Sequence, residues 1–190
     1  YAVVAYRTAY LKAYYPAEFM ASMLNSYLGN LDKVPEYIDE CKRMGIQILK
    51  PDINKSRGKF TVEDGKIRFG LGSIKNVGVQ PVDNIVKNRE ENGEFTSFTD
   101  FCERMAGDAV NKKCVESLIK AGTFSDFPET RATLIASFET IIDTVQSYNR
   151  KGMNGQVSMF DLGGNEEEES NNLNKVKYNF SIQPEMSDKE

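Results

Sequence analysis

Residues 71–86 read LGSIKNVGVQPVDNIV. Their order predicts a short helix, a tight turn around Val77 and a second helix that starts after Gly78. Asn76 occupies the position where such a turn begins with left-handed backbone dihedrals, which asparagine tolerates. Pro81 falls early enough in the second helix to cost no hydrogen bond. The stretch therefore predicts two helices joined by a tight turn.

This arrangement has the form of a helix-hairpin-helix. A glycine in the turn lets the backbone approach a phosphate, and amides at the start of the second helix donate to phosphate oxygens with help from the helix dipole. Such contacts do not read bases, so binding would be independent of sequence and sensitive to salt. The residues that we expect to contact duplex DNA here are Lys75, Asn76, Val77, Gly78, Lys87 and Arg89.

A second, looser copy of the pattern follows at residues 110–124, VNKKCVESLIKAGTF. It adds Lys112, Lys113, Lys120 and Gly122 to the candidate DNA-binding residues and favours a tandem pair of hairpins. Acidic residues match or outnumber basic ones within residues 70–127, however, so a purely structural helical bundle stays open as an alternative.

Helical and strand patterns flank this region. Apolar residues cover nearly every face of residues 2–14, as in a helix buried within a larger body, and Pro16 opens a second helix that Gly29 closes. Asn30 is expected to cap a third helix that stops at Gly45. Further predictions are a strand in residues 46–54, a hairpin over residues 59–70 around Asp64-Gly65, short helices to residue 124, and a last helix over residues 130–148.

Composition excludes several kinds of site. The chain has 190 residues, a net charge of -4 and no histidine, which removes Ser-His-Asp and Cys-His nucleophiles and every histidine-containing zinc site. Its three cysteines, Cys41, Cys102 and Cys114, lack C-x-x-C spacing and predict reduced thiols. No run approaches the length of a membrane span. We expect a soluble, cytoplasmic protein with no cofactor of its own and no membrane contact.

The stretch GQVSMFDL, residues 155–162, lies beyond the last periodic segment. One interpretation is an apolar peg that packs back on the last helix. The other is a linear peptide motif on a flexible tail, in which Gln156 meets a pocket rim while Met159 and Phe160 fill an apolar groove of a partner. From Gly163 onward the Gly-Asn-Glu-Ser composition indicates linker or disorder.

Four stretches taken together resemble one family. AVVAYRTAYLKAYYPAEFMASML (2–24), DKVPEYIDECKRMGIQILKPDIN (32–54), IRFGLGSIKNVG (67–78) and LIKAGTF (118–124) are similar to bacterial C-family replicative polymerases, the DNA polymerase III alpha subunits. The resemblance implies a mainly α fold. Its implied parts are helices from the end of the fingers (1–50), a connecting strand and β-hairpin (51–69), a tandem helix-hairpin-helix domain (70–127), a helix (128–150), and a flexible tail with a clamp-binding motif (151–190).

The resemblance also implies a function. The family is a DNA-directed DNA polymerase, a nucleotidyltransferase whose palm carboxylates hold two Mg²⁺ ions, and those carboxylates would precede Tyr1. The chain is then expected to be a non-catalytic fragment that binds duplex DNA, the sliding clamp through Gln156, Met159 and Phe160, and other replicase subunits through its parent. An error-prone relative of the replicative subunit and a free-standing helix-hairpin-helix protein or scaffold stay open as alternatives.

Overall fold

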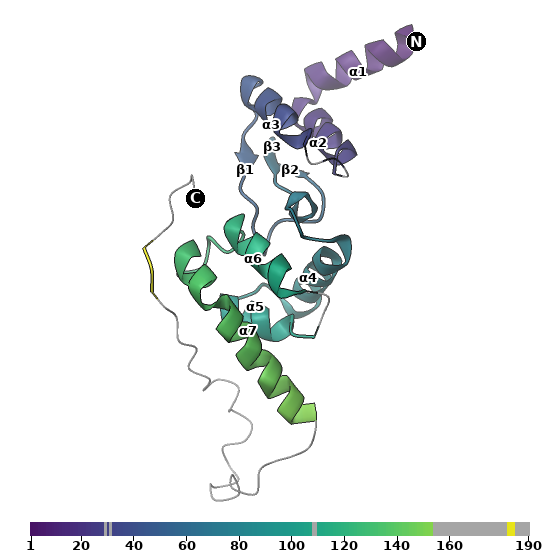
Figure 1. Cartoon of the computed structure of the whole chain (residues 1–190). Coiled ribbons are helices and arrows are strands. Elements are labelled where there is room, and N and C mark those ends of the chain that lie inside the picture. The colour runs from purple at the N-terminus through teal and green to yellow at the C-terminus, as the bar shows by residue number, and fades with distance from the viewer. Residues whose placement is uncertain (29, 31, 108–109, 154–181, 185–190) are drawn as a thin grey trace, which may run out of the picture.

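The computed structural model describes residues 1–28, 30, 32–107, 110–153 and 182–184. Within these residues the protein is mainly helical, with one small sheet between two groups of helices (Figure 1). The predicted fold class is confirmed in this respect. The expected tail, residues 151–190, lies almost entirely outside the described residues.

Three helices open the chain: α1 (Ala2–Tyr14), α2 (Pro16–Ser26) and α3 (Val34–Arg43). Proline begins α2 as predicted. The predicted cap at Asn30 is wrong, because α3 starts at Val34, after Lys33, and Pro35 occupies its first turn. Gly45 does follow α3 in the left-handed conformation, with φ of 75°.

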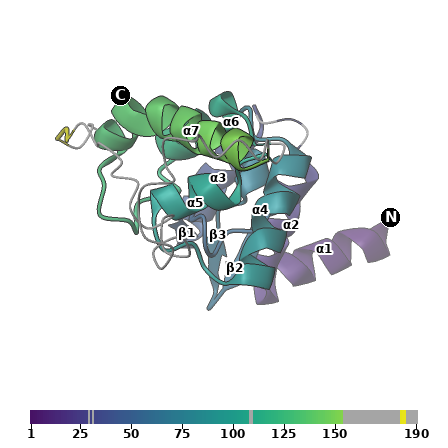
Figure 2. The ribbon, with the colours of Figure 1, turned by 90° about the horizontal axis from the view of Figure 1, so that it is seen from below.

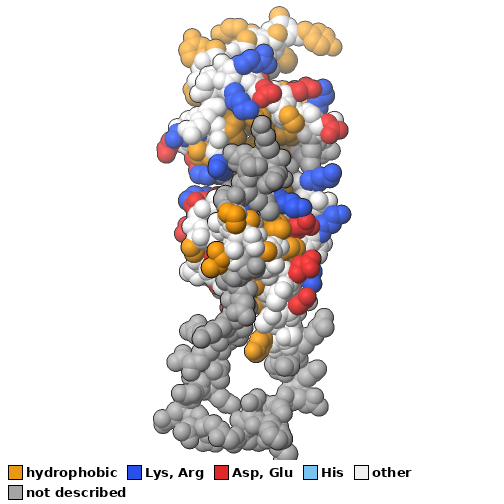
Figure 3. Space-filling view, turned by 60° about the vertical axis from the view of Figure 1, so that its left-hand side comes forward, with side chains coloured by type: hydrophobic (Ala, Val, Ile, Leu, Met, Phe, Trp, Pro, Cys, Tyr) orange, Lys and Arg blue, Asp and Glu red, His pale blue; other side chains and the backbone are white. Residues whose placement is uncertain are grey.

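Helix α1 buries none of its residues against the rest of the chain. Figure 3 shows hydrophobic side chains gathered at this end of the molecule. The large exposed ones on or beside the helix are Tyr1, Val3, Val4, Tyr6, Tyr10, Leu11, Tyr14 and Tyr15. The apolar side chains on all faces of α1 are therefore not buried by the described part of this chain.

The sheet has three short strands: β1 (Ile48–Leu49), β2 (Thr61–Glu63) and β3 (Lys66–Arg68). β2 and β3 form the predicted antiparallel hairpin, and its turn residues Asp64 and Gly65 have φ of 50° and 74°. The strand order is β1-β3-β2, with β1 parallel to β3. This parallel pairing was not predicted.

The second group of helices starts with the 3-10 turn η1 (Leu71–Ser73) and continues with α4 (Val79–Asn92), α5 (Phe98–Arg104), α6 (Lys112–Lys120) and α7 (Arg131–Met153). α7 packs on α5 and α6 (Figure 2). α5 starts after Ser97, whose hydroxyl accepts from the Asp100 amide.

Two apolar cores hold these groups. One joins α2 and α3 to Phe60 and Ile67 of the hairpin region. The other contains apolar residues of η1, α4, α5, α6 and α7, together with Ile53 from the segment before the hairpin. The predicted domain boundaries remain predictions, although α7 shares its core with residues 70–127.

Two glycines let the chain pass close to itself between these cores. A Cβ atom added at Gly70 would lie 2.6 Å from the Lys59 carbonyl carbon, and one at Gly72 would lie 2.7 Å from the Gly58 oxygen. Real Cβ atoms do not approach backbone so closely. The backbone at Gly70 and Gly72, at the start and middle of η1, therefore packs directly against the backbone of residues 58–60.

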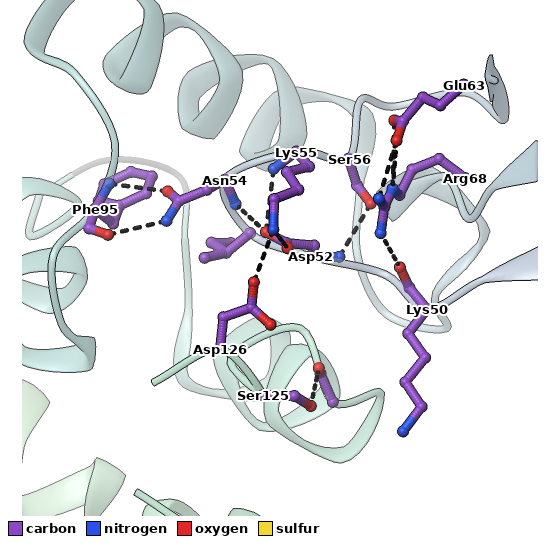
Figure 4. A network of polar contacts seen from close by, with 12 residues as sticks. Lys50, Asp52, Asn54, Lys55, Ser56, Glu63, Arg68, Phe95, Ser125 and Asp126 are labelled. Carbon is purple, nitrogen blue, oxygen red and sulfur yellow. Dashed lines mark hydrogen bonds and ion pairs between the residues drawn. The ribbon is translucent and has the colours of Figure 1, made fainter. Parts of the chain in front are cut away.

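A polar network ties the 52–56 loop to the helical body (Figure 4). The Asn54 amide donates to the Phe95 carbonyl at 2.9 Å and accepts from the Phe95 amide at 2.8 Å. The Lys55 ammonium contacts Asp126 at 2.8 Å and Asp52 at 3.0 Å. These hydrogen bonds raise the pKa of Lys55 and lower that of Asp126. The loop thus connects the segment between α4 and α5, at Phe95, with the turn before α7, at Asp126.

Candidate nucleic-acid interface

The turn between η1 and α4 has the geometry that the sequence predicts. Asn76 adopts φ of 64°, the left-handed conformation that asparagine tolerates better than other non-glycine residues. The Val77 amide donates to the Ile74 carbonyl at 3.1 Å, and the Val77 side chain is buried in the core. A single buried side chain therefore anchors the turn, while Lys75, Asn76 and Gly78 stay exposed.

The start of α4 presents backbone donors. Gly78 is the residue before the helix and makes no side-chain cap, and the first backbone hydrogen bond of the helix runs from the Val82 amide to the Gly78 carbonyl at 3.3 Å. Within the described part of the chain, the amides of Gly78, Val79 and Gln80 have no hydrogen-bond acceptor. Pro81 has no amide to offer. Exposed amides at a helix start favour an anion.

Gly78 is not required by packing inside the protein. Its φ of -79° is open to any residue, and an added Cβ would meet only the Pro81 ring, with Cδ at 3.5 Å. Ordinary van der Waals contact of this kind leaves room for a side chain. A glycine there exposes the helix start to a ligand, which is the role that the hairpin chemistry assigns to it.

Helix α6 lies beside this turn. Its start is capped by Asn111, whose side chain accepts from the Cys114 amide at 2.9 Å. The Asn76 side chain donates to the Ser117 hydroxyl at 3.2 Å. Residues spaced four and three apart share one side of a helix, so Lys113 and Lys120 flank Ser117 on the same side. We call this surface the hairpin face; it comprises Lys75, Asn76, Gly78, Lys113, Ser117 and Lys120.

The lysines predicted to bind DNA differ in whether they already form ion pairs within the protein. Lys75 and Lys113 are exposed, and neither has an ion pair among the described residues. Lys120 pairs with Glu116 at 2.6 Å, and Lys87 lies 3.9 Å from Glu91. Lys112 points to α7, where it pairs with Asp143 at 2.6 Å. Two lysines on the hairpin face are therefore open to a phosphate without breaking an existing pair.

Comparisons with known proteins agree with this geometry. The helix-hairpin-helix motif family matches residues 45–134, which include both predicted hairpin units. Over 170 residues the chain is 46% identical to DNA polymerase III subunit alpha of Saccharopolyspora erythraea, covering 87% of this chain and 14% of that protein. The protein of the same name from Borreliella burgdorferi is 44% identical over 160 residues, covering 84% and 14%. The Bacillus subtilis protein is 43% identical over 148 residues, covering 78% and 13%.

The chain is homologous to one segment of the DNA polymerase III alpha subunit. It spans about 14% of the length of the curated relatives that it matches. The predicted resemblance is thereby confirmed.

Three of the candidate residues serve the structure of the chain itself. The Arg89 guanidinium donates to the Ile53 carbonyl at 2.7 Å, and its burial lowers its pKa. Gly122 follows α6 with φ of 77°, a conformation that favours glycine. Val77 is a core residue. None of the three offers a free side chain to DNA, whereas the Val77 backbone still shapes the turn.

The predicted clamp-binding residues Gln156, Met159 and Phe160 lie outside the described residues. In the part of the chain that the structure describes, no helix has the length and apolar character needed to cross a membrane. The described residues also bring no three carboxylates or cysteines together in a way that could hold a metal ion. The cysteines are free and buried, and burial raises the pKa of Cys114 to about 11.

Sequence reasoning missed Ser117, the hydroxyl that receives Asn76. Ser117 is a small polar residue in the middle of a predicted helix, and no local pattern marks it. The signal that could have found it is its spacing of four from Lys113 and three from Lys120, which places all three on one helix side. The chain thus joins its two predicted hairpin units through a contact that only the fold reveals.

Proposed function

We propose that this chain is the part of a replicative DNA polymerase that holds duplex DNA by its backbone. The hairpin face binds phosphates through the amides at the start of α4 and through Lys75 and Lys113. The observation that carries the proposal is the exposed α4 start, with amides lacking acceptors among the described residues, beside two unpaired lysines.

The chemistry of the hairpin face explains what kind of binding to expect. Backbone amides and lysines contact phosphates of any sequence, so they position the duplex without reading bases. Few phosphates are neutralised, because of the three lysines on the hairpin face only Lys75 and Lys113 are without an ion pair to a described residue. Affinity should therefore be weak and should fall with salt at a log-log slope of about -1 to -3.

The test is a titration of the chain with two duplexes of unrelated sequence at several salt concentrations. We expect equal dissociation constants for the two duplexes and weaker binding as salt rises. Gly78→Val should reduce affinity at least about 5-fold, because its side chain would stand between the α4 amides and a phosphate. Equal binding by the wild type and Gly78→Val at low salt would return the helices to a purely structural role.

The proposal extends to a sliding clamp, the ring that would keep a polymerase on DNA while the phosphate contacts exchange. Gln156, Met159 and Phe160 have the spacing of the family's clamp motif, and the thioether of Met159 adapts to a groove. We expect affinity on the order of micromolar for an isolated peptide. A titration of a bacterial sliding clamp with the wild type and with Met159→Ala plus Phe160→Ala tests this. Unchanged affinity in the double variant would contradict clamp binding through these residues.

Nucleotide transfer would take place elsewhere in the parent polymerase. We infer that the carboxylates that hold its Mg²⁺ ions, and its contacts with other replicase subunits in the cytoplasm, belong to the longer protein. A clean preparation of this chain should incorporate no nucleotide on a primer-template with Mg²⁺. Metal-dependent primer extension would show that the chain is catalytic after all.

A further inference from the structure

The described residues Ile182–Pro184 lie far along the sequence from the helical core, yet they contact the first turn of α7. Figure 1 shows this short segment, in yellow, next to the end of the helical body where α7 begins. The Gln183 amide donates to the Thr133 hydroxyl oxygen at 2.9 Å, across 50 residues of sequence. The Thr130 hydroxyl donates to the Gln183 carbonyl at 2.8 Å.

The hydrogen bonds of the two threonines form one consistent set. Thr130 caps α7 by accepting from the Thr133 amide at 3.2 Å, and its single hydroxyl hydrogen then goes to Gln183. The Thr133 hydroxyl accepts from the Gln183 amide and lies 2.8 Å from the Thr130 hydroxyl, to which it can donate. Both backbone groups of Gln183 are thus satisfied by side chains at a helix start.

We propose that the start of α7 is a docking site for the chain's own extended segment around Gln183, recognised through its backbone. The side chains of residues 182–184 are exposed, and Ile182 is 88% exposed, so no side-chain pocket contributes. The two threonine hydroxyls bind the backbone amide and carbonyl of Gln183, as a neighbouring β-strand would bind the amide and carbonyl of one residue. Thr133, in contrast, is only 3% exposed, so its hydroxyl faces the docked segment rather than solvent.

The docking requires the chain to return from the end of α7 to its start. That helix has 23 residues and is therefore about 34 Å long. Residues 154–181 could reach roughly 90 Å if fully extended, so return to the start of α7 requires no strain. Because the segment is covalently connected, even a weak contact is populated. The candidate clamp motif begins just after α7 ends, so it would lie between two points fixed on the same helix.

Amide hydrogen exchange in the whole 190-residue chain tests the docking. In the wild type, the Gln183 amide should exchange about 10-fold or more slowly than in an unstructured peptide. Thr133→Val keeps the shape of the side chain and removes the acceptor, so exchange should rise to the peptide rate. Thr140→Val, on the exposed side of the same helix, is the matched control and should leave Gln183 protected. Peptide-like exchange in the wild type, or equal protection in Thr133→Val, would overturn the proposal.

A second pair of variants keeps the helical core untouched. Gln183→Pro removes the backbone donor, whereas Gln183→Ala removes only an exposed side chain. The Thr133 methyl resonance should move in Gln183→Pro and stay in place in Gln183→Ala. Identical Thr133 resonances in both variants and the wild type would show that the segment does not dock there. Neither measurement involves DNA or a clamp, so the result stands apart from the proposed function.

Discussion

The Asn76 side chain donates to the Ser117 hydroxyl at 3.2 Å, and this contact fixes the α4 hairpin turn against the middle of α6. The two residues are 41 positions apart in the sequence. The contact brings two separately predicted DNA-binding units onto one surface. The hairpin face is therefore a property of the fold rather than of either unit alone.

Asn76 should be sensitive to side chains that branch at Cβ. Its φ of 64° is strained for such residues, so Asn76→Val should lower the free energy of unfolding by about 2 kcal/mol. Asn76→Gly relieves the strain and loses only the bond to Ser117, so its effect should stay within about 1 kcal/mol. Urea denaturation measures both. Equal loss in the two variants would show that the dihedral angle does not matter.

Gly70 and Gly78 form a matched pair, since their φ angles of -80° and -79° are open to alanine. Gly70→Ala places a Cβ against the Lys59 backbone and should cost about 3 kcal/mol or prevent folding. Gly78→Ala meets only Pro81 and should cost less than about 1 kcal/mol. Thermal unfolding followed by circular dichroism compares them. A larger loss at Gly78 would contradict its assignment as a ligand-facing glycine.

Asn54 should be hard to replace even by its closest analogue. Its amide both donates to and accepts from the Phe95 backbone, and aspartate cannot donate. Asn54→Asp should therefore lower the free energy of unfolding by about 1–3 kcal/mol. Asn84→Asp is the control, because among the described residues the Asn84 side chain accepts from Gln80 on α4 and donates to no backbone group. Equal stability of the two variants in urea would exclude Asn54 as an anchor.

The Lys55–Asp126 ion pair should make stability depend on acid pH. The lowered pKa of Asp126 means that its contribution is present above the usual carboxyl pKa, near pH 4, and is lost as pH falls through the folded value. Asp126 is largely exposed, so Asp126→Asn should cost less than about 1 kcal/mol at pH 7. The difference from wild type in urea melts should shrink as pH falls below about 4. A constant difference from pH 7 to pH 3 would assign the effect to something other than charge.

Local signals predicted the parts of the fold that depend on neighbouring residues. The Asp64-Gly65 turn, the proline-initiated α2 and the left-handed Asn76 each follow from the conformational range of one or two residues. The apolar faces of α6 and α7 follow from their helical spacing. The failure of Asn30 as a cap shows the limit, since Pro35 can occupy the second position of a helix that starts at Val34.

Contacts between distant segments could not be read in the same way. The parallel pairing of β1 with β3, the bond from Asn76 to Ser117 and the approach of residues 58–60 to Gly70 depend on how helices pack. Whether a lysine is free to bind DNA also depends on residues that are distant in the sequence. Lys112 and Lys113 are adjacent in sequence, but only Lys112 has a carboxylate partner among the described residues.

Charge reversal at two exposed lysines tests whether duplex DNA binds at the hairpin face. Lys75 lies on the hairpin face and Lys66 on the β2–β3 hairpin; both are exposed and neither has an ion pair within the described residues. Duplex DNA is titrated with Lys75→Glu and with Lys66→Glu at low salt, after circular dichroism shows both folded. The hairpin face predicts that Lys75→Glu loses about 10-fold or more in affinity while Lys66→Glu stays within about 2-fold of the wild type. Equal losses in both variants would contradict binding at the hairpin face.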